Sequence, residues 1–284
     1  MLGKLLKYDL RSIFKYWWLF AVSSVGVSVL GAISLLGFAS AMQADTETDF
    51  IVFIGIMCFF AFLFCMLALS AFIIVAEILI YVRFYKNLFS DEGYLTFTLP
   101  VKRHQILTSK LIMAIITEAC TVTLFLVEIV SIFFVGLGPL FLETFGLDSI
   151  GTLFEALGLI FAELGVFSVI YIIEALILSL VTSAFSVLLV FACISFGSMI
   201  AKKHKVLASV GIYYLVNSVV SSGYSLVYLF GSSLISSIAV TVPQGFAMPI
   251  VSVALLVAIA IVAALAMLLY TLVHYMLDKK LNLA

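Results

Sequence analysis

The chain has 284 residues, of which 65% are hydrophobic and only 10% charged, and its mean hydropathy is +1.33. Soluble domains carry roughly 25% charged residues, so this composition excludes an ordinary soluble domain. The formal net charge of −1 is uninformative, because it hides a strong segregation of charge along the chain.

All fourteen Lys and Arg residues fall in four short clusters, and the long apolar stretches between them contain none. The clusters are Lys4, Lys7, Arg11 and Lys15; Arg83, Lys86, Lys102, Arg103 and Lys110; Lys202, Lys203 and Lys205; and Lys279 with Lys280. The other connecting segments carry acids without bases, at Asp45, Glu47 and Asp49 and then at Glu143, Asp148 and Glu155. Cytoplasmic loops are enriched in Lys and Arg. The pattern therefore predicts a multi-pass protein of the cell membrane with both termini in the cytoplasm.

Residues 2–15 have a helical pattern of their own, before the first long apolar run. Apolar residues recur at three- and four-residue spacing, and the four cations of the first cluster share the opposite face. This arrangement is typical of a helix that lies in the membrane interface. We expect such an interfacial helix here; the alternative is a charged segment that merely flanks the first span. The uncharged run over 16–44 is longer than the roughly 7–15 residues of the apolar core (h-region) of a signal peptide, so it is predicted to be a span.

A helix needs about 20 apolar residues to cross a bilayer. By this measure one transmembrane domain contains six spans, at about 16–41, 51–82, 111–136, 164–200, 206–231 and 249–276. The predicted fold is thus an all-α membrane protein with six transmembrane helices preceded by an interfacial helix. After the third span, Gly136, Gly138 and Pro139 predict a break in the helix. A short helix on the outer surface is expected to follow it, around residues 153–161.

The segment 83–110 is the only sizeable cytoplasmic surface, and it is too short to be a folded domain. Ser90, Asp91, Glu92 and Gly93 form a turn signal, after which Leu95, Phe97 and Leu99 alternate with Thr96 and Thr98. Pro100 is suited to open the next helix, with Lys102, Arg103 and Lys110 held at the lipid headgroups. Apolar side chains in a cytoplasmic loop favour either the membrane interface or a protein partner. A simple basic anchor between two spans is the alternative interpretation.

This segment resembles the first intracellular loop of the type-2 ABC exporter permeases. The resemblance rests on Glu92-Gly93, Leu95, Leu99-Pro100, Lys102-Arg103, Leu107 and Lys110. In that family an E-x-G-T-like turn leads through a short coupling helix to T-P, a basic pair and a Lys. Here Tyr94 stands where Thr is usual, and Leu99 separates Thr98 from Pro100. The basic helix before the first span, the six spans and the cytoplasmic termini also match the family layout.

The resemblance implies that the segment docks on a separate ATPase through Glu92, Gly93, Leu95, Phe97, Leu99, Pro100, Lys102, Arg103 and Lys110. The chain has no G-x-x-x-x-G-K-[ST] phosphate loop, so ATP and Mg²⁺ are expected in that partner and no cofactor in this chain. A second copy or a related permease chain is expected to complete the pathway. The cargo class would be a drug, a peptide or a lipid-like molecule. No nucleic-acid partner is expected.

Few side chains offer other chemistry. The three histidines and four cysteines show no metal-ligand or catalytic spacing, so the chain itself is not expected to be an enzyme. Acids within the predicted spans are Glu77, Glu118, Glu128 and Glu174, with Glu163 near an outer edge. Such acids must face other helices or water, and we single out Glu128 and Glu174 as candidates for the translocation path. Alternatively, each is a protonated acid bonded to a neighbouring hydroxyl, or both carry the proton of an ion-coupled secondary carrier.

Overall fold

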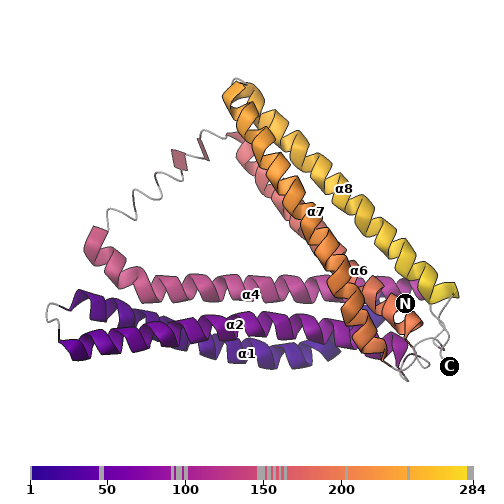
Figure 1. The fold of residues 1–284 in the computed structure, drawn as a ribbon, viewed down its shortest axis with the longest axis horizontal. Coiled ribbons are helices and arrows are strands. Elements are labelled where there is room, and N and C mark those ends of the chain that lie inside the picture. Colours follow the sequence, from indigo (N-terminus) through magenta and orange to yellow (C-terminus); the bar gives the residue numbers. More distant parts are fainter. Residues whose placement is uncertain are drawn as a thin grey trace. The chain divides into compact units, whose positions relative to one another are not determined.

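The computed structural model describes residues 2–44, 48–90, 93, 98, 102–145, 151, 155, 158–159, 161–162, 165–201, 204–241 and 244–279. The secondary structure of these residues is entirely helical. It is dominated by six long helices (Figure 1): α1 (Leu2–Gln43), α2 (Asp49–Phe89), α4 (Arg103–Phe145), α6 (Val166–Ile200), α7 (Lys205–Thr241) and α8 (Gln244–Lys279).

Each of these helices contains a segment long and apolar enough to cross a membrane. The segments are Gly3–Gln43, Asp49–Phe89, Arg103–Pro139, Val166–Ile200, Lys205–Gly231 and Pro249–Asp278. This result confirms the predicted all-helical fold with six long apolar helices that could span a membrane, and it indicates a multi-pass membrane protein. Most of the helices extend beyond the predicted spans, because nothing forces an α-helix to end where its apolar residues end.

The structure shows no separate interfacial helix over residues 2–15. These residues are instead the first turns of α1, which continues without interruption from Leu2 to Gln43. The reason is that residues 4–25 contain neither Gly nor Pro, so no helix breaker separates the basic segment from the apolar one. The basic face itself is present, since Lys4, Lys7, Arg11 and Lys15 are all exposed.

The predicted break at Pro139 is also wrong, because α4 continues through this residue to Phe145. Proline removes one backbone hydrogen bond and tends to bend a helix rather than end it when the flanking residues favour helix. Figure 1 shows the end of α4 bending away from the axis of the rest of the helix. The outer helix expected around 153–161 falls mostly outside the described residues.

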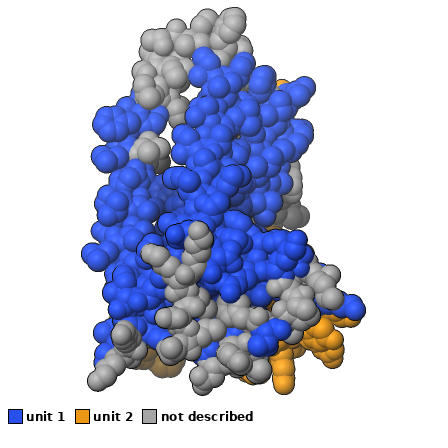
Figure 2. Space-filling view, turned by 90° about the vertical axis from the view of Figure 1, so that its right-hand side faces the viewer, with its two compact units in different colours: residues 1–6, 81–115, 164–284 blue, residues 7–80, 116–163 orange. Residues whose placement is uncertain are grey.

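The chain divides into two compact units (Figure 2). Unit 1 comprises residues 1–6, 81–115 and 164–284, and unit 2 comprises residues 7–80 and 116–163. Unit 1 therefore contains α6, α7 and α8 together with the end of α2 and the beginning of α4. Unit 2 contains most of α1 and α2 and the remainder of α4.

Unit 2 is a bundle in which α1 packs against both α2 and α4. Gly31 lies against Cys65 and Gly37 against Cys58, so α1 and α2 run antiparallel. Two hydrogen bonds join α1 to α4 at an equal separation of 104 residues, which means that these two helices run parallel. The buried core of the bundle consists of Ala32, Leu35, Leu69 and Ile132.

In unit 1, α6 packs against both α7 and α8, which touch each other only slightly. Phe185, Leu189 and Cys193 of α6 form a buried cluster with apolar side chains of both neighbours. The helices α6 and α7 approach each other tightly at Gly197, where a Cβ atom would lie 2.5 Å from the Cα of Ser209. Only a glycine permits this crossing.

Candidate functional site

Residues 83–110, the predicted docking segment, are described at both ends and, between them, only at Gly93 and Thr98. The described parts are the last turns of α2, Gly93, Thr98, and residues 102–110 at the start of α4. The other predicted docking residues, Glu92, Leu95, Phe97, Leu99 and Pro100, lie outside the described residues.

The end of α2 is anchored by aromatic packing within unit 1. Phe84 and Leu88 have no exposed surface. The ring of Phe84 stacks on that of Phe191 in α6, with the centroids 3.7 Å apart and the planes inclined by 4°. Because Phe191 is also fully buried, this stack fixes the end of α2 to α6.

Gly93 is helical and lies shortly after the end of α2. Its N–H donates to the carbonyl of Ser90 at 2.8 Å. A Cβ atom at this position would lie 2.7 Å from the carbonyl oxygen of Leu88, too close for any side chain to fit without a backbone shift. A close approach of the backbone to itself therefore requires a glycine at position 93, whereas the turn predicted over residues 90–93 falls partly outside the described residues.

The first turns of α4 are joined to the last turns of α8 by polar contacts. Arg103 Nη1 donates to the carbonyls of Leu277 and Asp278 at 2.6 and 2.8 Å. Further along, the hydroxyls of Thr108 and Tyr270 lie 3.0 Å apart. The carbonyls of Leu277 and Asp278 belong to the last turn of α8, where backbone acceptors have no partner within the helix. The Arg103 side chain therefore caps α8.

Lys102 and Lys110, predicted to lie at the headgroups together with Arg103, differ in their surroundings. Lys102 is exposed, as expected. Lys110 is only 3% exposed, which corrects that expectation. The reason is its position on α4: Ile106 and Met113, one turn away on either side, are also buried, so Lys110 lies on the packed face of the helix.

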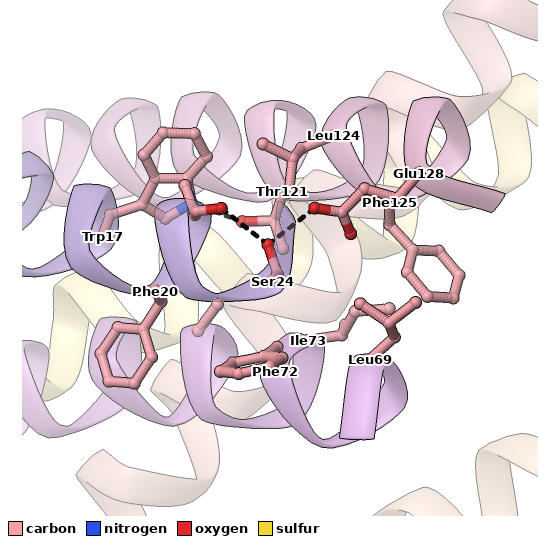
Figure 3. A pocket seen from close by; sticks show the side chains of 12 residues that line it. Trp17, Phe20, Ser24, Leu69, Phe72, Ile73, Thr121, Leu124, Phe125 and Glu128 are labelled. Atoms are coloured by element: carbon pink, nitrogen blue, oxygen red, sulfur yellow. Dashed lines mark hydrogen bonds between the residues drawn. The ribbon is translucent and has the colours of Figure 1, made fainter. Parts of the chain in front are cut away.

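Glu128 is buried in unit 2, with 4% of its surface exposed. Ser24 of α1 donates to its Oε1 at 2.7 Å (Figure 3). The same hydroxyl lies 2.9 Å from the carbonyl of Ala21. A hydroxyl has one proton to donate. When Glu128 is ionised, Ser24 donates to it; when Glu128 carries a proton, it can donate to Ser24, whose own proton then goes to Ala21.

A small cavity of about 20 Å³ adjoins this pair, with room for roughly one water molecule. Its wall combines aromatic rings of α1, α2 and α4 with the polar atoms of Ser24, Thr121 and Glu128 (Figure 3). Trp17 Nε1 donates to Thr121 Oγ1 at 2.9 Å. The polar groups thus line one wall of the cavity, while Phe20 and Phe72 lie opposite.

Glu174 is buried in unit 1, with 5% of its surface exposed. Ser252 of α8 donates to its Oε1 at 2.5 Å, whereas Oε2 is buried and has no hydrogen-bond partner among the described residues. Like Glu128, it pairs with a serine of another helix of its own unit. By contrast, Glu77 is exposed and Glu118 half-buried.

Sequence reasoning did not identify the partners Ser24, Ser252, Tyr270 and Phe191. They come from distant parts of the chain and carry no motif, so only the packing of the helices brings them to these positions. Comparison of the chain with protein-family models, with curated proteins and with solved structures gives no match.

Proposed function

We propose that the chain is the permease subunit of an ABC transporter, an exporter driven by a separate ATPase. The observation that carries the proposal is segment 83–110, whose Glu92-Gly93 turn, apolar alternation and basic pair resemble a coupling loop. The described ends of this segment support a mechanical role. Phe84 is stacked on Phe191, Gly93 lies against Leu88, and Arg103 caps α8. A segment held firmly at both ends can transmit a push from a docked partner.

The orientation that suits this function follows from the charge distribution. With an even number of spans both termini lie on the same side, and the Lys and Arg clusters assign that side to the cytoplasm. Segment 83–110 then faces the compartment that contains ATP. A second copy or a related permease chain would complete the pathway, and the cargo would be a drug, a peptide or a lipid-like molecule.

The decisive experiment replaces Leu95 and Leu99 together with Asp. Each buried apolar side chain contributes about 1.5–3 kcal/mol, so losing two anchors should weaken ATPase docking by about a hundredfold or more. The readouts are co-purification with the ATPase and permease-stimulated ATP hydrolysis in lipid. The matched control places two Asp residues at Thr96 and Thr98, the alternate positions of the same segment. Wild-type binding and transport by the Leu95→Asp/Leu99→Asp variant would reduce the segment to an anchor and overturn the proposal.

A secondary carrier driven by an ion gradient is the second candidate, favoured by one observation. Glu128 and Glu174 are both buried, and the contacts of Ser24 provide a hydrogen-bonding arrangement for each protonation state of Glu128. In a carrier, transport in vesicles would follow an imposed proton gradient without any ATPase. Glu128→Gln would abolish that transport, since an amide cannot bind and release the proton.

A further inference from the structure

The two ends of segment 83–110 contact different helices of the second half of the chain. The end of α2 contacts α6 through Phe84 and Phe191, and the start of α4 contacts α8 through Arg103. All of these residues belong to unit 1. The segment therefore contacts residues that follow it in the sequence by roughly 107 to 175 positions.

The contact with α6 is apolar and fully enclosed. Phe84, Leu88 and Phe191 have no exposed surface, and Val187 and Leu188 of α6 are 1–2% exposed. Two parallel rings 3.7 Å apart cannot slide past each other without opening a void. Any displacement of the end of α2 is thus passed to α6 at Phe191.

The contact with α8 is polar at its rim and apolar beneath. One nitrogen of Arg103 bonds two consecutive carbonyls of α8, and its distance to the Asp278 carboxylate is a longer 3.5 Å. The side chain of Arg103 is 43% exposed, so the ion pair is screened and the two carbonyl bonds dominate. Ile106 and Leu107 of α4 and Val273 and Leu277 of α8 are at most 1% exposed.

We propose that α6 and α8 receive the movement of segment 83–110 directly, through Phe84–Phe191 and through the Arg103 cap on α8. The inner ends of α6 and α8 then move with the segment as one body when a docked ATPase closes. Phe84 and Arg103 are positioning residues in this process. The inference rests on the proposed function for the source of the movement. The two contacts, Phe84 with Phe191 and Arg103 with the end of α8, are properties of this chain alone, and we call them the two joints.

Spin labels test the joints directly. In a variant without the four native cysteines, one pair at His104→Cys and Thr271→Cys spans α4 and α8. A second pair at Lys86→Cys and Phe196→Cys spans α2 and α6. All four positions are exposed. In protein reconstituted in lipid without an ATPase, we expect a single narrow distance distribution for each pair. Arg103→Ala should broaden the α4–α8 distribution and leave the α2–α6 distribution unchanged.

Addition of the ATPase and trapping of nucleotide should leave both distributions at their original centres. Measured at saturating ATPase, Arg103→Ala should lower permease-stimulated ATP hydrolysis by about tenfold, since two charge-assisted bonds are lost. The control is Lys205→Ala, which removes a cation outside segment 83–110. This variant should stimulate ATP hydrolysis as strongly as the wild type. If Arg103→Ala does not accumulate in the membrane, Arg103→Gln, which retains an N–H donor, replaces it.

Three results would overturn the inference. One is an α4–α8 distribution that remains narrow in Arg103→Ala; another is a shift of either pair on nucleotide trapping in protein with Arg103 intact. The third is full stimulation of ATP hydrolysis by Arg103→Ala. Failure of every ATPase to bind would instead refute the proposed function, and the label distances without ATPase would still decide whether the joints exist.

Discussion

Ser24 donates its hydroxyl proton to Oε1 of Glu128 across 2.7 Å, and the two residues are 104 positions apart in the chain. Trp17 and Thr121, which also form a hydrogen bond, have the same separation. The two bonds lie seven residues apart on both helices, about two turns. They therefore fix one register between α1 and α4, and Glu128 is held in place by that register.

Ser24→Ala should lower the stability of the protein by about 1 kcal/mol, because it leaves a buried carboxyl oxygen without this donor. The matched control is Ser23→Ala, since the exposed Ser23 hydroxyl bonds only carbonyls of its own helix. Glu128→Gln should leave assembly intact, because the amide retains hydrogen bonding at a lower insertion cost. Thermal unfolding in detergent measures both effects. Equal unfolding temperatures for Ser24→Ala and Ser23→Ala would show that the bond contributes nothing.

The free energy of unfolding should depend more strongly on the hydrogen bond from Ser252 to Glu174. Oε2 of Glu174 is already buried without a hydrogen-bond partner among the described residues, so Ser252→Ala removes the donor that the other oxygen has. We expect a loss of roughly 1–2 kcal/mol. In a Glu174→Leu background the same substitution should cost almost nothing, since replacing both members by apolar groups removes the unsatisfied atoms. A double-mutant cycle of unfolding free energies gives the coupling. Additive effects would mean that the two side chains do not interact.

The crossing of α6 and α7 provides a test of backbone packing. A Cβ atom at Gly197 would lie 2.1 Å from Ser209 Oγ and 2.5 Å from its backbone nitrogen, and the backbone atom cannot rotate away. Gly197→Ala should therefore force the helices apart and strongly reduce the yield of folded protein. Gly211→Ala in α7 is the control, because nothing lies within 4 Å of its Cβ position. Comparable yields of the two variants in size-exclusion chromatography would contradict the close crossing.

The six long helices could be predicted from the sequence because each depends on its own residues. An apolar run such as 249–276 must form its backbone hydrogen bonds internally in lipid, whatever its neighbours are. The continuity of α1 and the passage of α4 through Pro139 could not be predicted as safely. An amphipathic segment and a proline are each compatible with either a helix end or a continued helix, and the packing around them decides.

The partners in the candidate site could not be predicted at all. Nothing in the sequence distinguishes Ser24 from Ser23 or Ser28 as the donor to Glu128, because that depends on the register of α1 against α4. Similarly, the burial of Lys110 results from the face of α4 on which it lies, while the charge pattern indicates only its side of the membrane. The acids themselves could be picked out from the sequence, because a Glu within an apolar helix requires polar neighbours or water around its carboxyl group.

The orientation in the membrane can be tested by labelling. Single cysteines at Thr46, Asp148 and Ser236 should react with a membrane-impermeant reagent applied from outside. Cysteines at Lys86, Lys203 and Asn282 should react only after permeabilisation, because clusters of Lys and Arg favour the cytoplasmic side of a membrane. Reaction of Lys203→Cys from outside would refute the six-span arrangement with cytoplasmic termini.

Gly93 links the packing of α2 to the docking role proposed for segment 83–110. Gly93→Ala places a methyl group 2.7 Å from the Leu88 carbonyl oxygen and 2.9 Å from its carbon, so the turn must open. The hydrogen bond from Gly93 N–H to Ser90 should then weaken, and the amide at position 93 should exchange with deuterium about tenfold faster. Gly26→Ala in α1 is the control, since its Cβ position meets nothing within 4 Å. In the proposed permease, the displaced backbone at position 93 would shift the docking residues that follow it. Permease-stimulated ATP hydrolysis should therefore fall although Leu95 and Leu99 are intact. Exchange and stimulation at wild-type levels would show that the turn tolerates a side chain and that Gly93 is not required there.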